Sequence, residues 1–354
     1  MNILRRRTRQ VRVGTLSIGS ESPISVQSMS SVSADDISAC VGQALRLQNA
    51  GCDIFRFAVP SKSAAAVFDA AKNAGVTMPL VADIHFDYKI ALECAAAGAD
   101  KIRINPGNIG DDSRVKEVVK ACRSHGLPIR IGVNSGSLEK EILAKYGSPT
   151  PQALAESALY HASLLEKFDF YDTVISIKSS NSKNVIEANR ILAEKCDYPL
   201  HIGVTEAGSQ RMGVIKSAVG LGALLTDGIG DTLRVSLTAD PENEIRAAKD
   251  ILKAVGYCDS GINIVSCPTC GRTQIDLIKL VSEFEARQNE ITVKKPLTVA
   301  LMGCVVNGPG EAREADIGIA GGKGEALLIK RGDVIRKISE EGIITELIEE
   351  INRM

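Results

Sequence analysis

With 354 residues, the chain is longer than one ordinary domain, so we expect two domains or one large barrel with an appended domain. Hydrophobic residues make up 44% and charged residues 24%, a balance typical of soluble globular proteins. The formal net charge of −1 gives no overall attraction to nucleic acid or anionic membranes, and no apolar run of about 18 residues predicts a membrane span. The basic N-terminus lacks the apolar core of a secretory signal, so we expect a cytoplasmic protein whose nine cysteines form no disulfide framework.

The first predicted element is a hairpin in residues 9–19, RQVRVGTLSIG, which turns at Gly14 and can close the bottom of a barrel. From about residue 22 to 255, apolar runs then alternate with amphipathic stretches such as 37–50, 63–74 and 88–97. The runs are PISVQSMS, DIFRFAV, MPLVADIH, DKIRINP, LPIRIGVN, DTVISIKS, YPLHIGVTE and GIGDTLRVS.

Each run is continuously apolar, as expected of a strand that is buried on both faces of a parallel sheet. Eight strand–helix units in about 235 residues match the size of a (β/α)₈ TIM barrel. A doubly wound sheet is the alternative, but it rarely contains eight such regular units. We therefore predict an α/β chain with a TIM barrel over residues 1–257 that binds the substrate.

After about residue 258 the pattern changes to that of a small α+β domain over residues 258–354. Strand-like runs are INIVS, LTVALMG, DIGIAG and ALLIKRG, and helical patterns cover 274–288 and 340–353. Glycine is frequent between 303 and 332.

Polar side chains recur at the carboxyl ends of the predicted barrel strands, where TIM-barrel enzymes carry their catalytic groups. They are Arg56, Asp83, His85, Arg103, Asn105, Arg130, Asn134, Lys178, Thr205, Glu206, Arg234 and Ser236. Four arginines and a lysine at one rim favour a phosphate or diphosphate ligand, because the arginine fork matches its oxygens. The alternative, that each arginine pairs with a carboxylate, is weakened by the scarcity of acidic residues at these strand ends.

Two residue types in this rim keep alternative interpretations. Glu206 is either a proton donor or a partner of one of the arginines. A lone histidine in a strand is more often a hydrogen-bonded core residue than a ligand. His85, which lies beside Asp83, is a better candidate for substrate binding than His201.

Three cysteines of the small domain are the metal-site candidate. Cys267 and Cys270 form a C-x₂-C turn after one predicted strand, and Cys304 follows another strand in MGCVVNGPGE. Three thiolates suit a [4Fe–4S] cluster whose fourth iron carries out chemistry. A structural zinc site, which normally has four protein ligands, and three ordinary buried or redox cysteines are the alternatives. The remaining cysteines are interpreted as core or surface residues: Cys40, Cys52, Cys94, Cys122, Cys196 and Cys258.

Along nearly its whole length the chain resembles the 4-hydroxy-3-methylbut-2-enyl diphosphate synthase family in its two-domain bacterial form. The motifs that carry the resemblance are SVQSM, FRFAVP, VADIHFDY, KIRINPGN, PIRIGVNSGSL, HIGVTEAG, GIGDTLRVSL, SCPTCGR and MGCVVNGPGE. One departure is FRFAVP, where the family more often has aliphatic residues beside the arginine. The resemblance implies that Cys267, Cys270 and Cys304 hold a [4Fe–4S] cluster and that Glu311 is its fourth ligand.

The resemblance also implies roles for the rim. The diphosphate-binding residues would be Arg56, Arg103, Arg130, Lys178, Arg234 and Ser236. Asn134 and Glu206 would lie near the substrate, and Asn307 would approach it from the cluster domain. The implied substrate is 2-C-methyl-D-erythritol 2,4-cyclodiphosphate, and the implied partners are reduced flavodoxin or ferredoxin and a second copy of the chain in a head-to-tail homodimer.

Two other functions stay open from the sequence. One is a sugar-phosphate aldolase or isomerase barrel with a structural zinc tail, which would need no electrons. The other is a non-catalytic electron carrier, which would have no use for five basic residues at the rim of a barrel.

Overall fold

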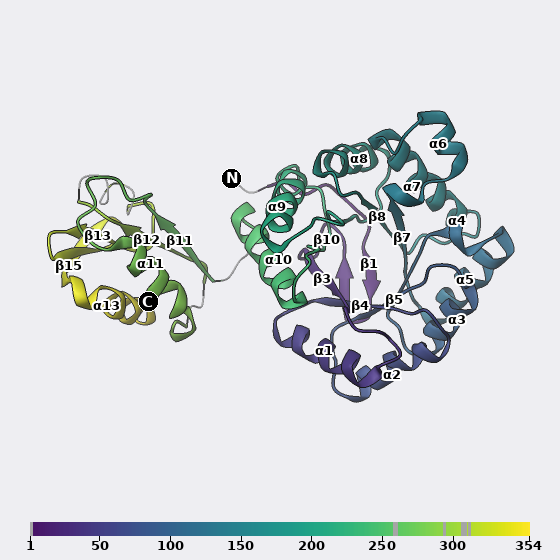
Figure 1. Ribbon diagram of the computed structural model, residues 1–354, viewed down its shortest axis with the longest axis horizontal. Coiled ribbons are helices and arrows are strands. Elements are labelled where there is room, and N and C mark those ends of the chain that lie inside the picture. The colour runs from purple at the N-terminus through teal and green to yellow at the C-terminus, as the bar shows by residue number, and fades with distance from the viewer. Residues whose placement is uncertain (1–2, 258–260, 293–294, 306–309, 311–312) are drawn as a thin grey trace. The chain divides into compact units, whose positions relative to one another are not determined.

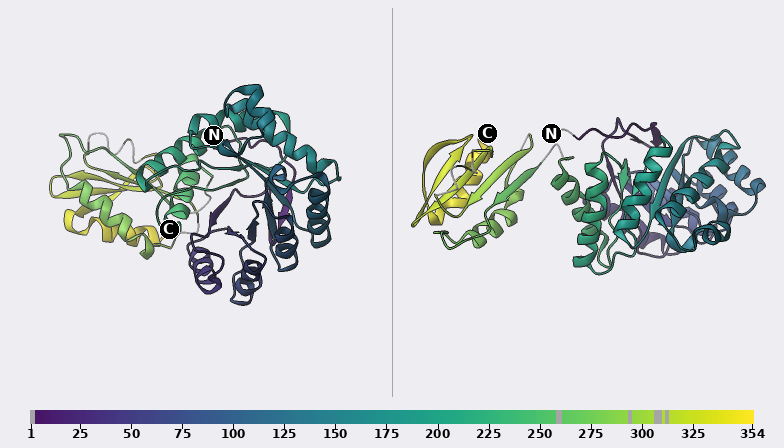
Figure 2. Two further views of the ribbon diagram at one scale, coloured as in Figure 1. Left: turned by 45° about the vertical axis from the view of Figure 1, so that its right-hand side comes forward. Right: turned by 90° about the horizontal axis from the view of Figure 1, so that it is seen from above.

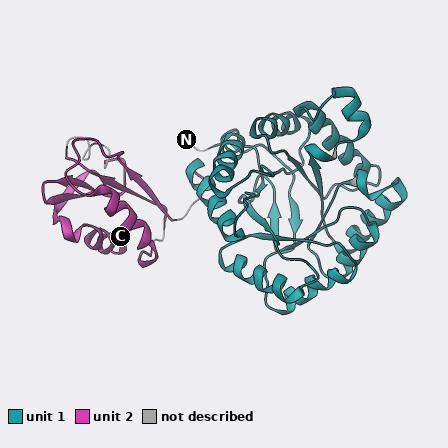
Figure 3. Ribbon diagram, viewed as in Figure 1, with its two compact units in different colours: residues 1–255 teal, residues 256–354 magenta. Residues whose placement is uncertain are grey.

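The computed structural model describes residues 3–257, 261–292, 295–305, 310 and 313–354. The chain divides into two compact units, residues 1–255 and residues 256–354 (Figure 3). Within the described part of the chain, no helix is both long enough and apolar enough to cross a membrane.

The first unit is a barrel of eight parallel strands surrounded by helices (Figure 1). The strands are β3 (Ser25–Met29), β4 (Ile54–Ala58), β5 (Leu80–Asp83), β6 (Lys101–Ile104), β7 (Ile129–Asn134), β8 (Thr173–Lys178), β9 (His201–Ile202) and β10 (Thr232–Leu233). They follow the order β8-β7-β6-β5-β4-β3-β10-β9, and a bridge between Ile175 and Leu200 closes the ring. All eight predicted strands are confirmed, although β9 and β10 have only two residues each.

Helices follow the strands and cover the outside of the barrel. They are α1 (Ile37–Asn49), α2 (Ala66–Asn73), α3 (Tyr88–Ala96), α4 (Pro106–Ile109), α5 (Asp112–His125), α6 (Lys140–Tyr146), α7 (Pro151–Glu166), α8 (Ser182–Lys195), α9 (Gln210–Thr226) and α10 (Pro241–Val255). Local sequence sets the ends of these helices. The side chains of Asp111 and Asn181 accept hydrogen bonds from backbone amides in the first turns of α5 and α8. Gly126 ends α5 with a φ of 65°, which glycine adopts without strain.

The N-terminal hairpin closes the bottom of the barrel, as predicted. Its strands are β1 (Val11–Val13) and β2 (Leu16–Ile18), and Gly14 turns between them with a φ of 56°. Val13 and Ile18 are fully buried against Ile54, the first residue of β4, and Val81, the second residue of β5. The apolar side of the hairpin therefore seals the end of the barrel opposite the carboxyl ends of the strands.

The second unit has a five-stranded sheet with two helices on one face (Figure 2). In sheet order, the strands are β11 (Ile262–Ser266), β12 (Leu297–Met302), β13 (Ile317–Gly322), β14 (Glu325–Lys330) and β15 (Asp333–Ser339), and the helices are α11 (Leu277–Ala286) and α13 (Ile343–Asn352). Strands β11, β12 and β13 run parallel, whereas β14 and β15 are antiparallel. Phe284 of α11 and Leu347 of α13 are fully buried against Val299 of β12.

Candidate functional site

Five basic side chains come together at the carboxyl ends of the barrel strands. We call this set the cationic rim: Arg56, Arg103, Arg130, Lys178 and Arg234. They line one cavity of about 230 Å³ together with Met29, Asp83, His85, Asn134, Ser176 and Thr205. Strand register explains the grouping, because Asp83 is paired with Arg103, Arg103 with Arg130, and Asn134 with Lys178.

Asp83 is the carboxylate that orders one side of this cavity. Arg103 Nη1 lies 2.9 Å from Oδ1, and Arg56 Nε lies 3.6 Å from Oδ2. His85 Nε2 lies 3.8 Å from the same Oδ2, with its side chain half exposed. Burial alone would raise the pKa of Asp83, but the adjacent arginines lower it below its ordinary value. Asp83 is therefore ionised and fixes the direction of two guanidinium groups.

Glu244 of α10 plays the same structural part on the other side. Arg234 donates to both of its oxygens at 3.3 Å, and Ser28 Oγ donates to Oε2 at 2.9 Å. This contact could not be predicted from the sequence, because Glu244 lies in a helix ten residues after Arg234. This residue positions the rim and does not line the cavity.

Arg130 and Lys178 are buried, and the described part of the chain offers neither of them an ion-pair partner. Their exposed fractions are 1% and 6%, and neither forms an ion pair with any of the described acidic residues. Arg130 Nε and Nη2 have no hydrogen-bond partner in the described part of the chain. Burial, reinforced by the neighbouring arginines, lowers the pKa of both groups. Five basic groups facing two carboxylates leave an excess of positive charge, which an anion would offset.

Some predicted residues lie outside this cavity, and some cavity residues were not predicted. Of the described residues, Glu206 is exposed and Ser236 is half-buried, and neither lines the cavity. Glu206 has a φ of 50°, a strained conformation for a non-glycine residue that is common at functional sites. The Met29 thioether accepts a hydrogen bond from Arg56 Nη2 at 2.7 Å. Met29 and Ser176 both line the cavity, and neither residue could be recognised as part of the site from the sequence.

Three described cysteines of the second unit, Cys267, Cys270 and Cys304, lie at one edge of its sheet. Cys267 follows β11 and Cys304 follows β12, and these parallel strands end side by side with Ser266 paired to Leu301. The Gly303 amide donates to Cys267 Sγ at 3.3 Å. Since carboxyl ends of neighbouring parallel strands meet at the same edge, the two thiols face the same region.

Cys270 joins this edge through Arg272. Arg272 Nε donates to Cys270 Sγ at 3.5 Å, and this hydrogen bond lowers the pKa of the Cys270 thiol. The hydrogen bond to Cys270, and then the charges of Cys270 and Cys304, raise the pKa of Arg272. Cys304 is buried, Cys267 is half-buried and Cys270 is exposed.

The three described cysteines of this edge offer soft thiol donors. No group of three His, Cys, Asp or Glu side chains in the described ranges is close enough to hold one metal ion. A cluster of four irons is wider than one ion, so its ligands stand further apart, and soft thiolates suit it. The predicted residues Asn307 and Glu311 lie outside the described residues.

The other described cysteines belong to the barrel and are ordinary core or partly buried residues. Cys40, Cys52, Cys94 and Cys122 are buried, and Cys196 is partly buried. Burial raises the pKa of Cys52, Cys94 and Cys122 to about 12 in each case, so these thiols are protonated. Cys258 lies outside the described residues.

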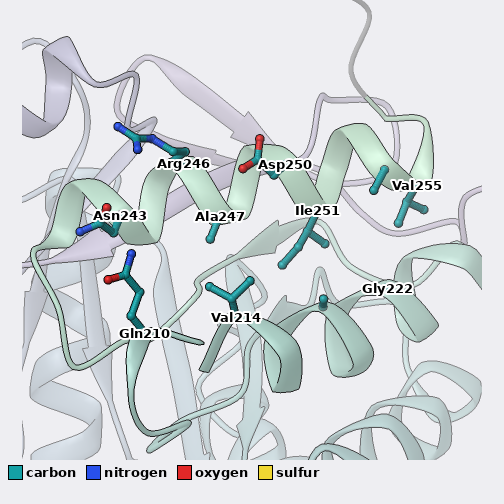
Figure 4. A pocket seen from close by; sticks show the side chains of 11 residues that line it. Gln210, Val214, Gly222, Asn243, Arg246, Ala247, Asp250, Ile251 and Val255 are labelled. Carbon is teal, nitrogen blue, oxygen red and sulfur yellow. The ribbon is translucent and has the colours of Figure 1, made fainter. Parts of the chain in front are cut away.

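A second feature of the barrel is a groove between α9 and α10 with a volume of about 420 Å³ (Figure 4). Val214 of α9 and Ile251 of α10 point into it from opposite sides. On α9, Met212, Ile215 and Val219 are about half exposed. Their spacing of three and four residues places them along one stripe of the helix. A helix that is apolar around most of its circumference is typical of one that is covered by a partner.

Comparison with known proteins identifies relatives over the whole chain. The 4-hydroxy-3-methylbut-2-en-1-yl diphosphate synthase (flavodoxin) of Clostridium perfringens is 56% identical over 346 residues, which cover 98% of each chain. The enzyme of the same name from Fusobacterium nucleatum is 54% identical and covers 97% of this chain and 96% of its own. The type I 3-dehydroquinate dehydratase of Clostridium difficile, with 15% identity, has a TM-score of 0.50 over 70% of this chain and 98% of its own, which shows the barrel fold alone.

Two family descriptions account for the two units. Residues 8–249 match the GcpE TIM-barrel domain. Residues 263–353 match the GcpE protein C-terminal domain. The chain therefore belongs to the GcpE family.

Proposed function

We propose that this chain catalyses reductive ring opening and dehydration of 2-C-methyl-D-erythritol 2,4-cyclodiphosphate to (E)-4-hydroxy-3-methylbut-2-enyl diphosphate, a step of isoprenoid biosynthesis. The observation that carries the proposal is the match, at 52–56% identity and over nearly the full length, to relatives whose names state this synthase activity. The substrate dianion, two electrons and one proton give the product trianion and one water, so the reaction balances.

The cationic rim supports the diphosphate part of the proposal. Arg130 and Lys178 are buried and face no carboxylate partner among the described residues, so an anionic ligand would satisfy them. Arg56, Arg103 and Arg234 are held in place by Asp83 and Glu244 before any ligand arrives. Preorganised cations of this kind stabilise the negative charge that grows on the phosphate as the ring opens.

Other residues take proposed roles around this anion. His85 and Asn134 line the same cavity and would orient the substrate. Ser236, two residues beyond Arg234, would donate to a phosphate oxygen, and Asn307 would approach from the second unit. Glu206 is our candidate for the proton that accompanies loss of the hydroxyl group, and its strained φ of 50° supports a functional role.

Cys267, Cys270 and Cys304 would hold a [4Fe–4S] cluster, with the Glu311 carboxylate as an exchangeable fourth ligand. Such a cluster, when bound, supplies single electrons and one accessible Lewis-acidic iron. The amide of Gly303 and the guanidinium of Arg272 donate to two of the sulfur atoms and would stabilise them as thiolates. The eight described cysteines are all free, in keeping with a reducing cytoplasmic location.

The electron donor and the assembly complete the proposal. The relatives' names specify flavodoxin, so we take reduced flavodoxin as the donor, with ferredoxin as the alternative. The half-exposed apolar stripe of α9 beside the α9–α10 groove supports a second copy of the chain as the partner of this face. In the head-to-tail arrangement, the cluster domain of each subunit would serve the barrel of the other.

Turnover by anaerobically purified protein tests the proposal. The full chain is incubated with the cyclic diphosphate and reduced flavodoxin, and phosphorus NMR follows the phosphate signals. We expect the cyclic signals to be replaced by those of a linear diphosphate ester, and only when reduced donor is present. Conversion without any reductant would favour the aldolase or isomerase alternative.

A further inference from the structure

A second layer of polar side chains lies inside the barrel, below the cationic rim. Lys101 precedes Arg103 by two residues in β6, and alternate residues of a strand face the same side, so both point into the barrel. By the same alternation, Gln27 of β3 and His201 of β9 face the interior. We call Gln27, Lys101 and His201 the lower layer. None of them lines the rim cavity, so Lys101 is not a contact residue of that site.

The lower layer is buried and poorly satisfied. Lys101 and His201 have exposed fractions of 0%, and that of Gln27 is 1%. Lys101 Nζ, both amide atoms of Gln27 and Nε2 of His201 have no hydrogen-bond partner in the described ranges. An ammonium group in such a place is strongly disfavoured, whereas a neutral amine is disfavoured much less.

The charged groups around Lys101 reinforce this preference. The positive charges of Arg130 on β7 and Arg56 on β4 disfavour a charge on Lys101, and Lys101 in turn disfavours a charge on His201 of β9. On β5 its register partner is the apolar Val81, and the nearest carboxylate of that strand, Asp83, is already engaged by two arginines.

The residue before Lys101, Asp100, is also engaged elsewhere. It accepts hydrogen bonds from Lys72 at 3.0 Å and from the Leu80 amide at 2.8 Å. No described carboxylate is therefore available to hold Lys101 as an ammonium ion. Burial first, and then Arg130 and Arg56, lower the pKa of Lys101 well below its ordinary value.

We infer that Lys101 is a proton acceptor coupled to the rim: its amine is neutral in the ligand-free barrel and takes up a proton when the diphosphate substrate binds. The inference rests on the proposed function, because the anion at the rim is taken to be the cyclic diphosphate. One proton moves from the buffer to Nζ and converts the amine to an ammonium ion, and no electron is transferred.

The physical reason is charge balance within a closed interior. Arginine does not lose its proton in proteins, so lysine is the group that can respond to a change in charge. Two negative charges at the rim offset the repulsion from Arg56 and Arg130, which makes a protonated Lys101 favourable. Because binding then consumes a proton, the association constant should fall as pH rises through the range between the pKa values of Lys101 in the free and bound barrel.

Calorimetry of the full chain measures this coupling directly. Both phosphorus centres of the cyclic diphosphate are strongly acidic diesters that do not titrate near neutral pH, so any proton uptake belongs to the protein. Titration in two buffers of different ionisation enthalpy gives the number of protons taken up. We compare the unaltered chain, Lys101→Met, and Lys183→Met as the control, since Lys183 is 80% exposed on α8.

We expect the unaltered chain and Lys183→Met to take up equal numbers of protons, and Lys101→Met to take up about one fewer per bound anion. Equal uptake by Lys101→Met, with binding retained, would overturn the inference and leave the rim site intact. An absence of binding to the unaltered chain would overturn both the inference and the anion site. Should Lys101→Met fail to fold, Lys101→Gln replaces it, with the same criteria.

Discussion

Individual carboxylates decide where the rim arginines point. Asp83 holds Arg103 at 2.9 Å and Arg56 at 3.6 Å, while Glu244 holds Arg234. The sequence could predict the arginines, because a basic residue at the end of a buried strand is unusual. It could not predict Glu244, because a glutamate in an amphipathic helix is most often solvated, and nothing in one sequence tells which glutamate turns inward.

Replacing Asp83 with Asn should destabilise the fold. The change leaves Arg56 and Arg103 buried without their counter-charge, which should lower the free energy of unfolding at pH 7 by about 3 kcal/mol or more. Glu242→Gln, which removes a surface pair with Arg46, is the control and should cost about 1 kcal/mol at most. Urea denaturation measures both changes. An Asp83→Asn protein as stable as the control would contradict the assigned ion pairs.

The ion pairs of Asp83 also predict how the stability of the fold depends on pH. The pKa of Asp83 is lowered in the native state, so its stabilisation is fully present above the unfolded pKa of about 3.9. It is lost as pH falls through the lower native pKa. The stability difference between the unaltered chain and Asp83→Asn should therefore shrink only below about pH 4. A difference that disappears already at neutral pH would assign the effect to another group.

The proposed cluster cysteines differ from the barrel cysteines in a testable way. Cys304→Ser should yield protein without the brown cluster absorbance and without turnover, because one thiolate ligand is lost. Cys122→Ser, at a buried barrel cysteine, should keep both, apart from some loss of stability. Iron analysis and visible spectra of anaerobically purified proteins provide the measurement. A brown, active Cys304→Ser protein would remove Cys304 from the ligand set.

Elements with a strong hydrophobic pattern were predicted well, and marginal ones were not. The barrel strands and the hairpin were found because their residues are buried on both faces or alternate cleanly. β15 was missed because it is an edge strand with mostly exposed residues, including Val334 and Ile335, so burial leaves no periodic signal. The two-residue lengths of β9 and β10 could not be predicted either, since the apolar runs around them are longer than the paired segments.

The hairpin offers a test at the scale of the element. Ile18 is fully buried against the first residues of the barrel strands, so Ile18→Ala should cost about 2–5 kcal/mol of unfolding free energy. Ser17→Ala, on the exposed side of β2, should change little. If both variants unfold at the same urea concentration, the hairpin does not contribute to the barrel core.

At the scale of the whole molecule, the proposed chemistry needs groups from both units. The cationic rim belongs to residues 1–255 and the cysteines to residues 256–354. The sequence pattern predicted two kinds of architecture because the strand–helix alternation stops before the cysteines. One sequence contains no information on which barrel a given cluster domain serves, since that depends on contacts between folded units.

Mixing two inactive variants tests the proposed head-to-tail homodimer. Arg130→Ala removes a rim cation, and Cys304→Ser removes a cluster ligand. If each site combines the barrel of one subunit with the cluster domain of the other, a heterodimer has one intact site, and random exchange should restore about a quarter of the normal activity. The same mixture without subunit exchange is the control and should stay inactive. No recovery after verified exchange would show that both groups come from one chain.

The most direct test of the proposed function is the EPR spectrum of the reduced, anaerobically purified full chain with and without the cyclic diphosphate. We expect a [4Fe–4S] signal that changes when the substrate is added. In an Arg130→Ala protein, the cluster signal should be present but respond only at much higher substrate concentration. Protein without iron, or a cluster signal that saturating substrate leaves unchanged, would contradict the proposed function.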